Sequence, residues 1–150
     1  MLAHSFDTVF GRVTAVESDR RLVMLRFGEL PDIEIGNTPL LLETERQIKE
    51  YLAGERKQFD IPVNIQCEGF RKDVMETMAR IPYGKTMSYG CIAKSCGHPG
   101  AGRAVGTVCR KNPLPIIYPC HRVVPSSGGI GNYSGPPGMK EKLLSLERSE

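Results

Sequence analysis

Two stretches near the start of the chain, residues 8–17 and 21–27, are rich in β-branched and apolar side chains. Asp19 and Arg20 lie between them as a short polar break. Runs of this length and composition around a two-residue break are typical of paired strands. The pattern therefore predicts an antiparallel hairpin or meander at the N-terminus.

A helical period follows over residues 41–53, after a stretch rich in proline and glycine. Its apolar side chains recur on one side of a helix, and Gly54 marks a plausible end. The segment 59–63 is short and extended, and Pro62 interrupts it. The apolar positions of the helix are Leu41, Ile48, Tyr51 and Leu52.

The second half of the chain is helical and divided by turns. An apolar stripe at i, i+4, i+8 and i+11 predicts an amphipathic helix from Phe70 to Ile81. Ser88 can cap a short helix over 89–96, and a second short helix covers 101–111. Two short helices joined by a glycine-containing turn form a helix-turn-helix pattern.

A long loop, residues 112–135, contains four prolines and several glycines together with cysteine and histidine. Loops of that length within a compact domain are usually functional or disordered, and the reactive side chains favour function. A last helix begins at Pro136-Pro137, with Met139, Leu143 and Leu146 on its buried face. These elements predict an α+β protein with two domains, residues 1–62 and 63–150.

Charge is divided unequally between these domains. Residues 1–62 hold 8 Lys+Arg and 11 Asp+Glu, a net charge of −3, whereas residues 63–150 hold 12 and 6, a net charge of +6. This asymmetry indicates that the second domain binds a polyanion. No apolar run approaches the roughly 20 residues of a membrane span, and the N-terminus does not resemble a signal peptide.

Five cysteines are present, and no two are spaced as C-x-x-C. An odd number without that spacing argues against a disulfide framework and a structural zinc site, and favours a reducing, cytoplasmic location. Four of them fit the role of small buried apolar side chains. They are Cys67, Cys91, Cys96 and Cys109.

Cys120 stands apart because His121 follows it and Pro119 precedes it in the long loop. The thiolate is the nucleophilic form of cysteine, and it needs a nearby base at neutral pH. A histidine can supply that base if a carboxylate orients its ring. The dipeptide alone is weak evidence, since Cys-His pairs arise often by chance.

The surrounding motifs resemble those of the O6-alkylguanine-DNA alkyltransferases. The resemblance extends from Phe70 to Glu147 without an obvious gap, whereas the first 60 or so residues match only in length and coarse pattern. Its motifs are Ile-Pro-Tyr-Gly-Lys-Thr-Met-Ser-Tyr at 81–89, Gly-Arg-Ala-Val-Gly at 102–106, Asn-Pro at 112–113, Pro-Cys-His-Arg-Val at 119–123 and Gly-Asn-Tyr-Ser-Gly at 131–135.

The resemblance implies a self-alkylating enzyme. Cys120 would accept the alkyl group irreversibly, His121 would take its proton through a water, and Glu147 would orient His121. Asn112 would hold the loop beside the helix-turn-helix. Tyr89 would help to rotate the 3′ phosphate and would protonate guanine N3 as the base leaves.

The same resemblance implies how substrate and DNA are held. Arg103 would enter the duplex and fill the space of the flipped base, whose extrusion costs a few kcal/mol. Ser134 would donate to guanine O6. The other expected substrate-binding residues are Tyr133, Gly131, Val123 and Pro115, and the other expected DNA-binding residues are Tyr89, Ala104, Gly106, Arg110 and Lys111.

The implied fold is a small N-terminal sheet domain similar to ribonuclease H, without that nuclease activity, followed by a winged-helix-like domain. The partner would be double-stranded DNA carrying O6-alkylguanine, bound through the minor groove with little sequence preference by a monomer. No metal or cofactor is expected, because the N-terminal part lacks the Cys/His set that binds zinc in some relatives.

Three alternatives remain. A non-catalytic lesion sensor of the alkyltransferase-like type would have another residue in place of Cys120. A Cys-His hydrolase would need an oxyanion hole and a separate histidine, and it would leave Arg103 unexplained. A transcriptional helix-turn-helix module would not account for residues 112–135.

Overall fold

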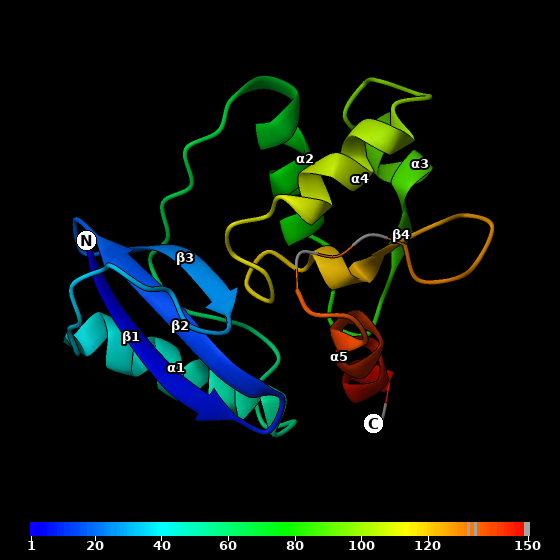
Figure 1. Cartoon of the computed structure of the whole chain (residues 1–150). Helices are drawn as coiled ribbons and strands as arrows, with labels where there is room; N and C mark the ends of the chain where they lie inside the picture. Colours follow the sequence, from blue (N-terminus) through cyan, green and yellow to red (C-terminus); the bar gives the residue numbers. More distant parts are fainter. Residues whose placement is uncertain (132, 134, 149–150) are drawn as a thin grey trace. The chain divides into compact units, whose positions relative to one another are not determined.

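The computed structural model describes residues 1–131, 133 and 135–148, and its chain divides into two units, Met1–Ile65 and Gln66–Glu150 (Figure 1). Within the described residues no helix has both the length and the apolar character that a membrane crossing requires. No group of three potential metal-binding side chains occurs in this part of the chain either.

The first unit is a three-stranded antiparallel sheet of β1 (Leu2–Thr8), β2 (Gly11–Ser18) and β3 (Arg21–Phe27), with β2 in the centre. The turn between β2 and β3 is the predicted one. Asp19 and Arg20 have φ values of 51° and 62°, the left-handed conformation that a two-residue hairpin turn requires. The antiparallel pairing that the sequence predicted is therefore confirmed.

Strand β1 was not predicted. The sequence predicted a first strand over residues 8–17, whereas residues 2–8 form β1 and the next strand, β2, begins at Gly11. Leu2–Thr8 contains His4, Ser5 and Asp7 and has few β-branched residues, so its local preference for a strand is weak. Pairing with β2 over the whole length, from Leu2 opposite Glu17 to Thr8 opposite Gly11, makes it a strand.

Helix α1 (Pro39–Leu52) packs on this sheet (Figure 1). Thr38 caps it by accepting a hydrogen bond from Leu41 N at 3.2 Å, and Pro39 occupies the first helical position, where its missing N–H costs nothing. Its apolar face is buried as the period predicted. Leu41, Ile48 and Tyr51 are all 0% exposed.

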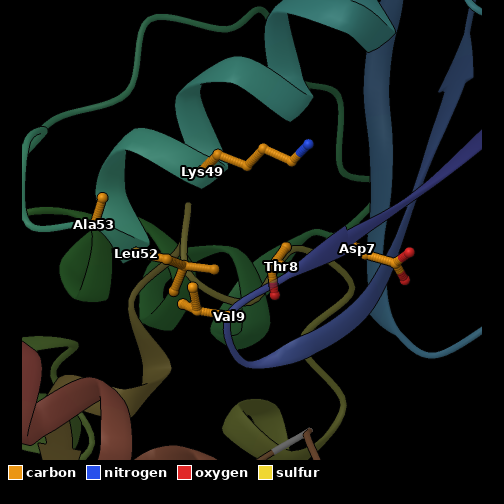
Figure 2. Close-up of a pocket in the computed structure, with 6 residues that line it drawn as sticks. All are labelled: Asp7, Thr8, Val9, Lys49, Leu52 and Ala53. Atoms are coloured by element: carbon orange, nitrogen blue, oxygen red, sulfur yellow. The ribbon is translucent and has the colours of Figure 1, made fainter.

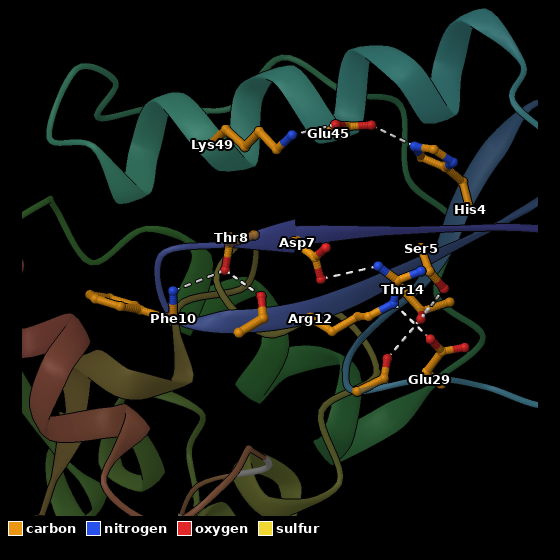
Figure 3. Close-up of polar contacts among 12 residues, drawn as sticks. His4, Ser5, Asp7, Thr8, Phe10, Arg12, Thr14, Glu29, Glu45 and Lys49 are labelled. Atoms are coloured by element: carbon orange, nitrogen blue, oxygen red, sulfur yellow. Dashed lines mark hydrogen bonds and ion pairs between the residues drawn. The ribbon is translucent and has the colours of Figure 1, made fainter.

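Polar contacts join α1 to the sheet and the strands to one another (Figure 3). Glu45 accepts from His4 and from Lys49, with both distances 2.5 Å. Arg12 donates to Asp7 at 3.0 Å and to Glu29 at 2.7 Å, and both contacts are exposed to solvent. Exposed ion pairs contribute little, about 0–1 kcal/mol each, so apolar burial supplies most of the stability of this unit.

The second unit contains α2 (Gly69–Ala79), α3 (Tyr89–Ser95), α4 (Gly102–Arg110) and α5 (Met139–Arg148). Ser88 caps α3 as predicted, accepting from Cys91 N at 3.0 Å. Helices α3 and α4 pack together and are joined by a tight turn, so the helix-turn-helix pattern is present.

The predicted long loop contains a short helix and a short strand. Residues Cys120–Arg122 form a 3-10 turn, η1, and β5 (Val123–Val124) pairs in parallel with β4 (Met87–Ser88). Two-residue strands leave no periodic pattern, and their partners lie far apart in the sequence. This pairing attaches η1 to the segment that leads into α3.

We expect Ile48→Ala in α1 to lower the free energy of unfolding by about 2–5 kcal/mol, because it opens a cavity in the core of the first unit. Leu42→Ala is the matched control, since Leu42 is on the same helix and 47% exposed. It should cost under about 1 kcal/mol. Denaturation followed by far-UV circular dichroism measures both, because the chain has no tryptophan. Equal losses would contradict the assigned buried face.

Candidate functional site

The segment that leads to Cys120 is held by the side chain of Asn112, which is 5% exposed. Its Nδ2 donates to Tyr118 O at 2.8 Å, and its Oδ1 accepts from Leu114 N at 2.9 Å. The loop between them is thus closed by one amide group acting as both donor and acceptor. Asn112 itself lies two residues after the end of α4, so it connects the helix-turn-helix to the loop.

Backbone strain is present in the same loop. Ile116 has a φ of 76° and is 2% exposed. A β-branched residue in this region costs about 1–3 kcal/mol and persists only where its surroundings enforce it. The Asn112 hydrogen bonds, and a bond from Tyr118 N to Leu114 O at 2.9 Å, supply that enforcement.

Cys120 begins η1, and its side chain is 0% exposed. Its backbone N donates to Tyr118 O at 2.7 Å, the same carbonyl that Asn112 binds. The predicted acceptor is therefore placed by the loop closure and not by a long helix. Pro115 and Val123, two expected substrate-binding residues, are also buried.

His121 and Glu147 are in direct contact, as the sequence predicted. His121 Nε2 lies 2.7 Å from Glu147 Oε2, and the two side chains are 0% and 2% exposed. A carboxylate only accepts hydrogen bonds, so Nε2 carries the proton and Nδ1, also buried, is the basic nitrogen of the neutral ring.

Burial is the largest influence on the His121 ring and lowers its pKa. Glu147 raises the pKa through its hydrogen bond and its charge, whereas Arg122 and Lys140 lower it. Together these effects lower the pKa of His121, which favours the neutral imidazole. A neutral ring can accept a proton, which is what a base beside a reactive thiol requires.

Arg122, next in the chain, completes this cluster. It donates to both oxygens of Glu147, through Nε and Nη2 at 3.0 Å each, and through Nη1 to Ile81 O at 2.7 Å. Gly84 N donates to Glu147 Oε1 at 3.1 Å. The cluster thus joins η1, α5 and the turn after α2.

Lys140 and Tyr89 form a second polar group in this unit. Lys140 is 1% exposed, and its Nζ donates to Val123 O at 2.6 Å and to the Tyr89 hydroxyl at 3.4 Å. Burial lowers the pKa of Lys140, and the charges of Cys109, Cys120 and Glu141 oppose that effect. Tyr89 therefore has a fixed polar neighbour for its hydroxyl.

Gly131 lies so close to the ring of Tyr89 that a side chain at this position would force the ring to move. A Cβ at this position would lie 2.4 Å from the Tyr89 hydroxyl oxygen, and its φ is 82°. The glycine is therefore required by both conformation and space. Of the other expected substrate residues, Tyr133 is half-buried and Ser134 lies outside the described residues.

Cys109 is one of the four cysteines that the sequence predicted to pack as small apolar side chains. It is 0% exposed on α4, and burial raises its pKa to about 12. A thiol that resists ionisation is inert as a nucleophile. Burial is thus confirmed for Cys109, whereas the prediction is wrong for Cys91, which is exposed, and for Cys67 and Cys96, which are half-buried.

Helix α4 presents the expected DNA-binding side chains on one side. Arg103, Ala104, Arg110 and Lys111, the residue that follows the helix, are exposed, whereas Gly106 is buried beside Val105. Gly106 is three residues after Arg103 and four before Arg110, so it flanks the exposed face although it is itself buried. Three cations around one small alanine make this face suited to a phosphate backbone.

Two residues of the site were missed by the sequence analysis, Lys140 and Arg122. The helix period contained a usable sign, because Lys140, Leu144 and Glu147 follow each other at i, i+4 and i+7. In the structure these three residues are buried together with Met139 and Leu143. Leu146, which was expected on the buried face, is only half-buried. Charged residues on a buried helical face point to paired, functional groups.

A hollow of about 400 Å³ occurs in the first unit and has no part in this chemistry (Figure 2). None of the reactive or helix-turn-helix residues lines it. Its lining residues are Asp7, Thr8, Val9, Lys49, Leu52 and Ala53.

We expect Asn112→Ala to speed amide hydrogen exchange at Leu114 and to lower the stability of the second unit by about 1–3 kcal/mol, because a buried amide loses its acceptor. Asn112→Asp is the matched control, since it keeps the oxygen that accepts from Leu114. Exchange at Leu114 should stay slow in the aspartate variant. Equally fast exchange in both variants would contradict the role of this hydrogen bond.

Comparison with known proteins covers both units. Residues 1–65 match the 6-O-methylguanine DNA methyltransferase ribonuclease-like domain, and residues 69–149 match the DNA binding domain of the same proteins. The predicted α+β fold, with a ribonuclease-like sheet domain and a helical DNA-binding domain, is thereby confirmed.

Individual relatives agree with this match. A methylated-DNA–protein-cysteine methyltransferase of Methanosarcina acetivorans is 43% identical, over 81% of this chain and 78% of that protein. The constitutive enzyme of the same name from Bacillus subtilis is 36% identical, over 95% and 92%. The crystal structure of Mycobacterium tuberculosis OGT in complex with DNA superimposes with a TM-score of 0.90 at 36% identity, covering 99% and 94% of the two chains. With both domains matched along nearly its whole length, the chain belongs to the 6-O-methylguanine DNA methyltransferase family.

Proposed function

We propose that this protein repairs O6-alkylguanine in DNA by transferring the alkyl group to its own Cys120. The observation that carries the proposal is the placement of Cys120, buried at the start of η1 and followed directly by the His121–Glu147–Arg122 cluster. This arrangement puts a thiol next in sequence to a neutral, oriented imidazole. Family membership assigns the same chemistry.

The transfer is a displacement at the alkyl carbon. His121 takes the proton of Cys120 through a water, and the resulting thiolate attacks the alkyl carbon. The carbon–sulfur bond forms while the bond to guanine O6 breaks, and the electron pair of that bond remains on the guanine. The carbon–sulfur bond of the thioether product is not cleaved under cellular conditions, so each protein molecule acts once.

The departing guanine takes up a proton at N3, for which Tyr89 is the proposed donor. Lys140 holds the Tyr89 hydroxyl and Gly131 closes against its ring, so this side chain has a fixed position in the free protein. Ser134 is the proposed donor to O6, with Tyr133, Gly131, Val123 and Pro115 around the base.

DNA binding is proposed through helix α4. Arg103, Ala104 and Arg110 are its exposed residues, Lys111 is exposed directly after it, and the net charge of residues 63–150 is +6. Minor-groove binding with little sequence preference suits a protein that scans for damage. A monomer in the cytoplasm, or associated with the nucleoid or nucleus according to the cell type, is the proposed working form.

The non-catalytic sensor is the second candidate from the sequence. Cys120 and the intact His121–Glu147 contact favour transfer over sensing, because a sensor has no need of either.

The test is a single-turnover reaction with a duplex that contains O6-methylguanine. The protein should gain the mass of one methyl group at Cys120, and Cys120→Ser should gain none while still binding the duplex, since this side chain is buried and makes no phosphate contact. Peptide mass spectrometry locates the methyl group. Transfer by Cys120→Ser, or a methyl group on another cysteine, would sink the proposal.

Arg103 is tested separately, by comparing duplex with single-stranded substrate. If Arg103 fills the space of the flipped base, Arg103→Ala should slow repair about 10- to 100-fold in duplex and much less in single strand, because flipping costs a few kcal/mol only in duplex. Arg103→Lys should rescue partly, since an ammonium cannot stack as a guanidinium does.

Arg110→Ala is the matched control on the same helix. It should weaken binding to both substrates alike and reduce the salt dependence of binding, as the loss of a phosphate contact does. If Arg103→Ala behaves like Arg110→Ala, Arg103 is a phosphate contact and has no filling role.

A further inference from the structure

Arg122 is a buried guanidinium whose three nitrogens all have fixed acceptors. It is 7% exposed, and it binds both oxygens of Glu147 and the carbonyl of Ile81. The ring of Tyr83 lies 5.6 Å from its central carbon. The Arg122 side chain is therefore not a solvated charge. In the sequence it follows directly after the reactive Cys120-His121 pair.

Glu147 is held as a carboxylate by this arrangement. Its two oxygens accept from Arg122 twice, from Gly84 N at 3.1 Å and from His121 Nε2 at 2.7 Å. Each of these contacts is made to an N–H donor, and hydrogen bonds of that kind favour the ionised form. The cluster therefore contains one buried negative charge in contact with the His121 ring.

An uncompensated carboxylate in that position would favour the imidazolium form of His121. Two cations act in the opposite direction, Arg122 from η1 and Lys140 from α5. Arg122 is the one that also binds Glu147. It is thus placed to cancel the charge of Glu147 without removing the hydrogen bond that orients His121.

We propose that Arg122 is a positioning residue that keeps His121 in its neutral, proton-accepting form by balancing the charge of Glu147. The inference rests on the proposed function, in which His121 accepts the proton of Cys120. Carboxylate and guanidinium then have separate tasks. Glu147 sets the orientation of the His121 ring, and Arg122 keeps Nδ1 of that ring unprotonated and able to accept a proton.

A purely structural ion pair makes a different prediction. Breaking a buried pair destabilises a protein, and this loss of stability alone would lower activity without moving its pH dependence. The proposal requires that the pH dependence itself move. Removal of the positive charge raises the pKa of His121, so the neutral ring appears only at higher pH.

The experiment is single-turnover methyl transfer from an O6-methylguanine duplex as a function of pH, with protein in excess so that binding is saturated. Arg122→Gln should shift the rising midpoint of the profile upward by about one pH unit, the effect of losing one nearby charge. Arg122→Lys keeps the charge and loses the bidentate geometry, so its midpoint should stay near that of the unmodified protein although its stability falls.

The double variant Arg122→Gln/Glu147→Gln removes both charges, and its midpoint should move back toward the unmodified value, at a lower rate. Arg148→Gln is the control, because Arg148 is an exposed arginine adjacent to Glu147 in α5. It should leave the midpoint in place. An unmoved midpoint in folded Arg122→Gln would overturn the proposal.

Nuclear magnetic resonance of the His121 ring nitrogens gives a readout that needs no DNA. The ring should gain a proton at higher pH in Arg122→Gln than in Arg122→Lys, and equal titration of the two would also overturn the proposal. If the unmodified protein transfers no methyl group, the proposed function fails, whereas the titration still decides what Arg122 does to His121.

Discussion

The carboxylate of Glu147 is the contact on which the reactive part of the second unit depends. It accepts hydrogen bonds from the turn after α2, through Gly84, and from η1, through His121 and Arg122. A single side chain near the end of α5 therefore fixes both the base and the segment that presents the thiol. Buried ion pairs have a large desolvation cost, and this one is tolerated because each oxygen of the carboxylate has more than one donor.

Asn112 performs the corresponding task at the other end of the loop. Its amide binds Tyr118 O, which also accepts from Cys120 N, and it supports the strained backbone at Ile116. The thiol is thus located between an amide on one side and a carboxylate on the other. Asn112 lies outside any helix and Glu147 lies near the end of α5, so the position of the loop comes from side chains at its two ends.

The sequence alone predicted the structural features that follow a periodic pattern and the family that a distinctive motif identifies. The α1 stripe, the Asp19-Arg20 turn and the Ser88 cap follow local rules, and the Pro-Cys-His-Arg-Val run identified the family. Strand β1 was missed because its strand character comes from pairing with β2 and not from its own residues. Burial of Lys140 and the contacts of Arg122 were missed because they depend on which segments meet in space.

The complete burial of the Cys120 side chain has a consequence for a protein that is consumed by its reaction. Any stray electrophile that reached the sulfur would spend the molecule without removing a lesion. With no surface of the thiol open to solvent, a diffusing alkylating agent has no direct contact with the sulfur of the free protein. Burial of the acceptor sulfur therefore limits the side reactions that would consume the protein without repair.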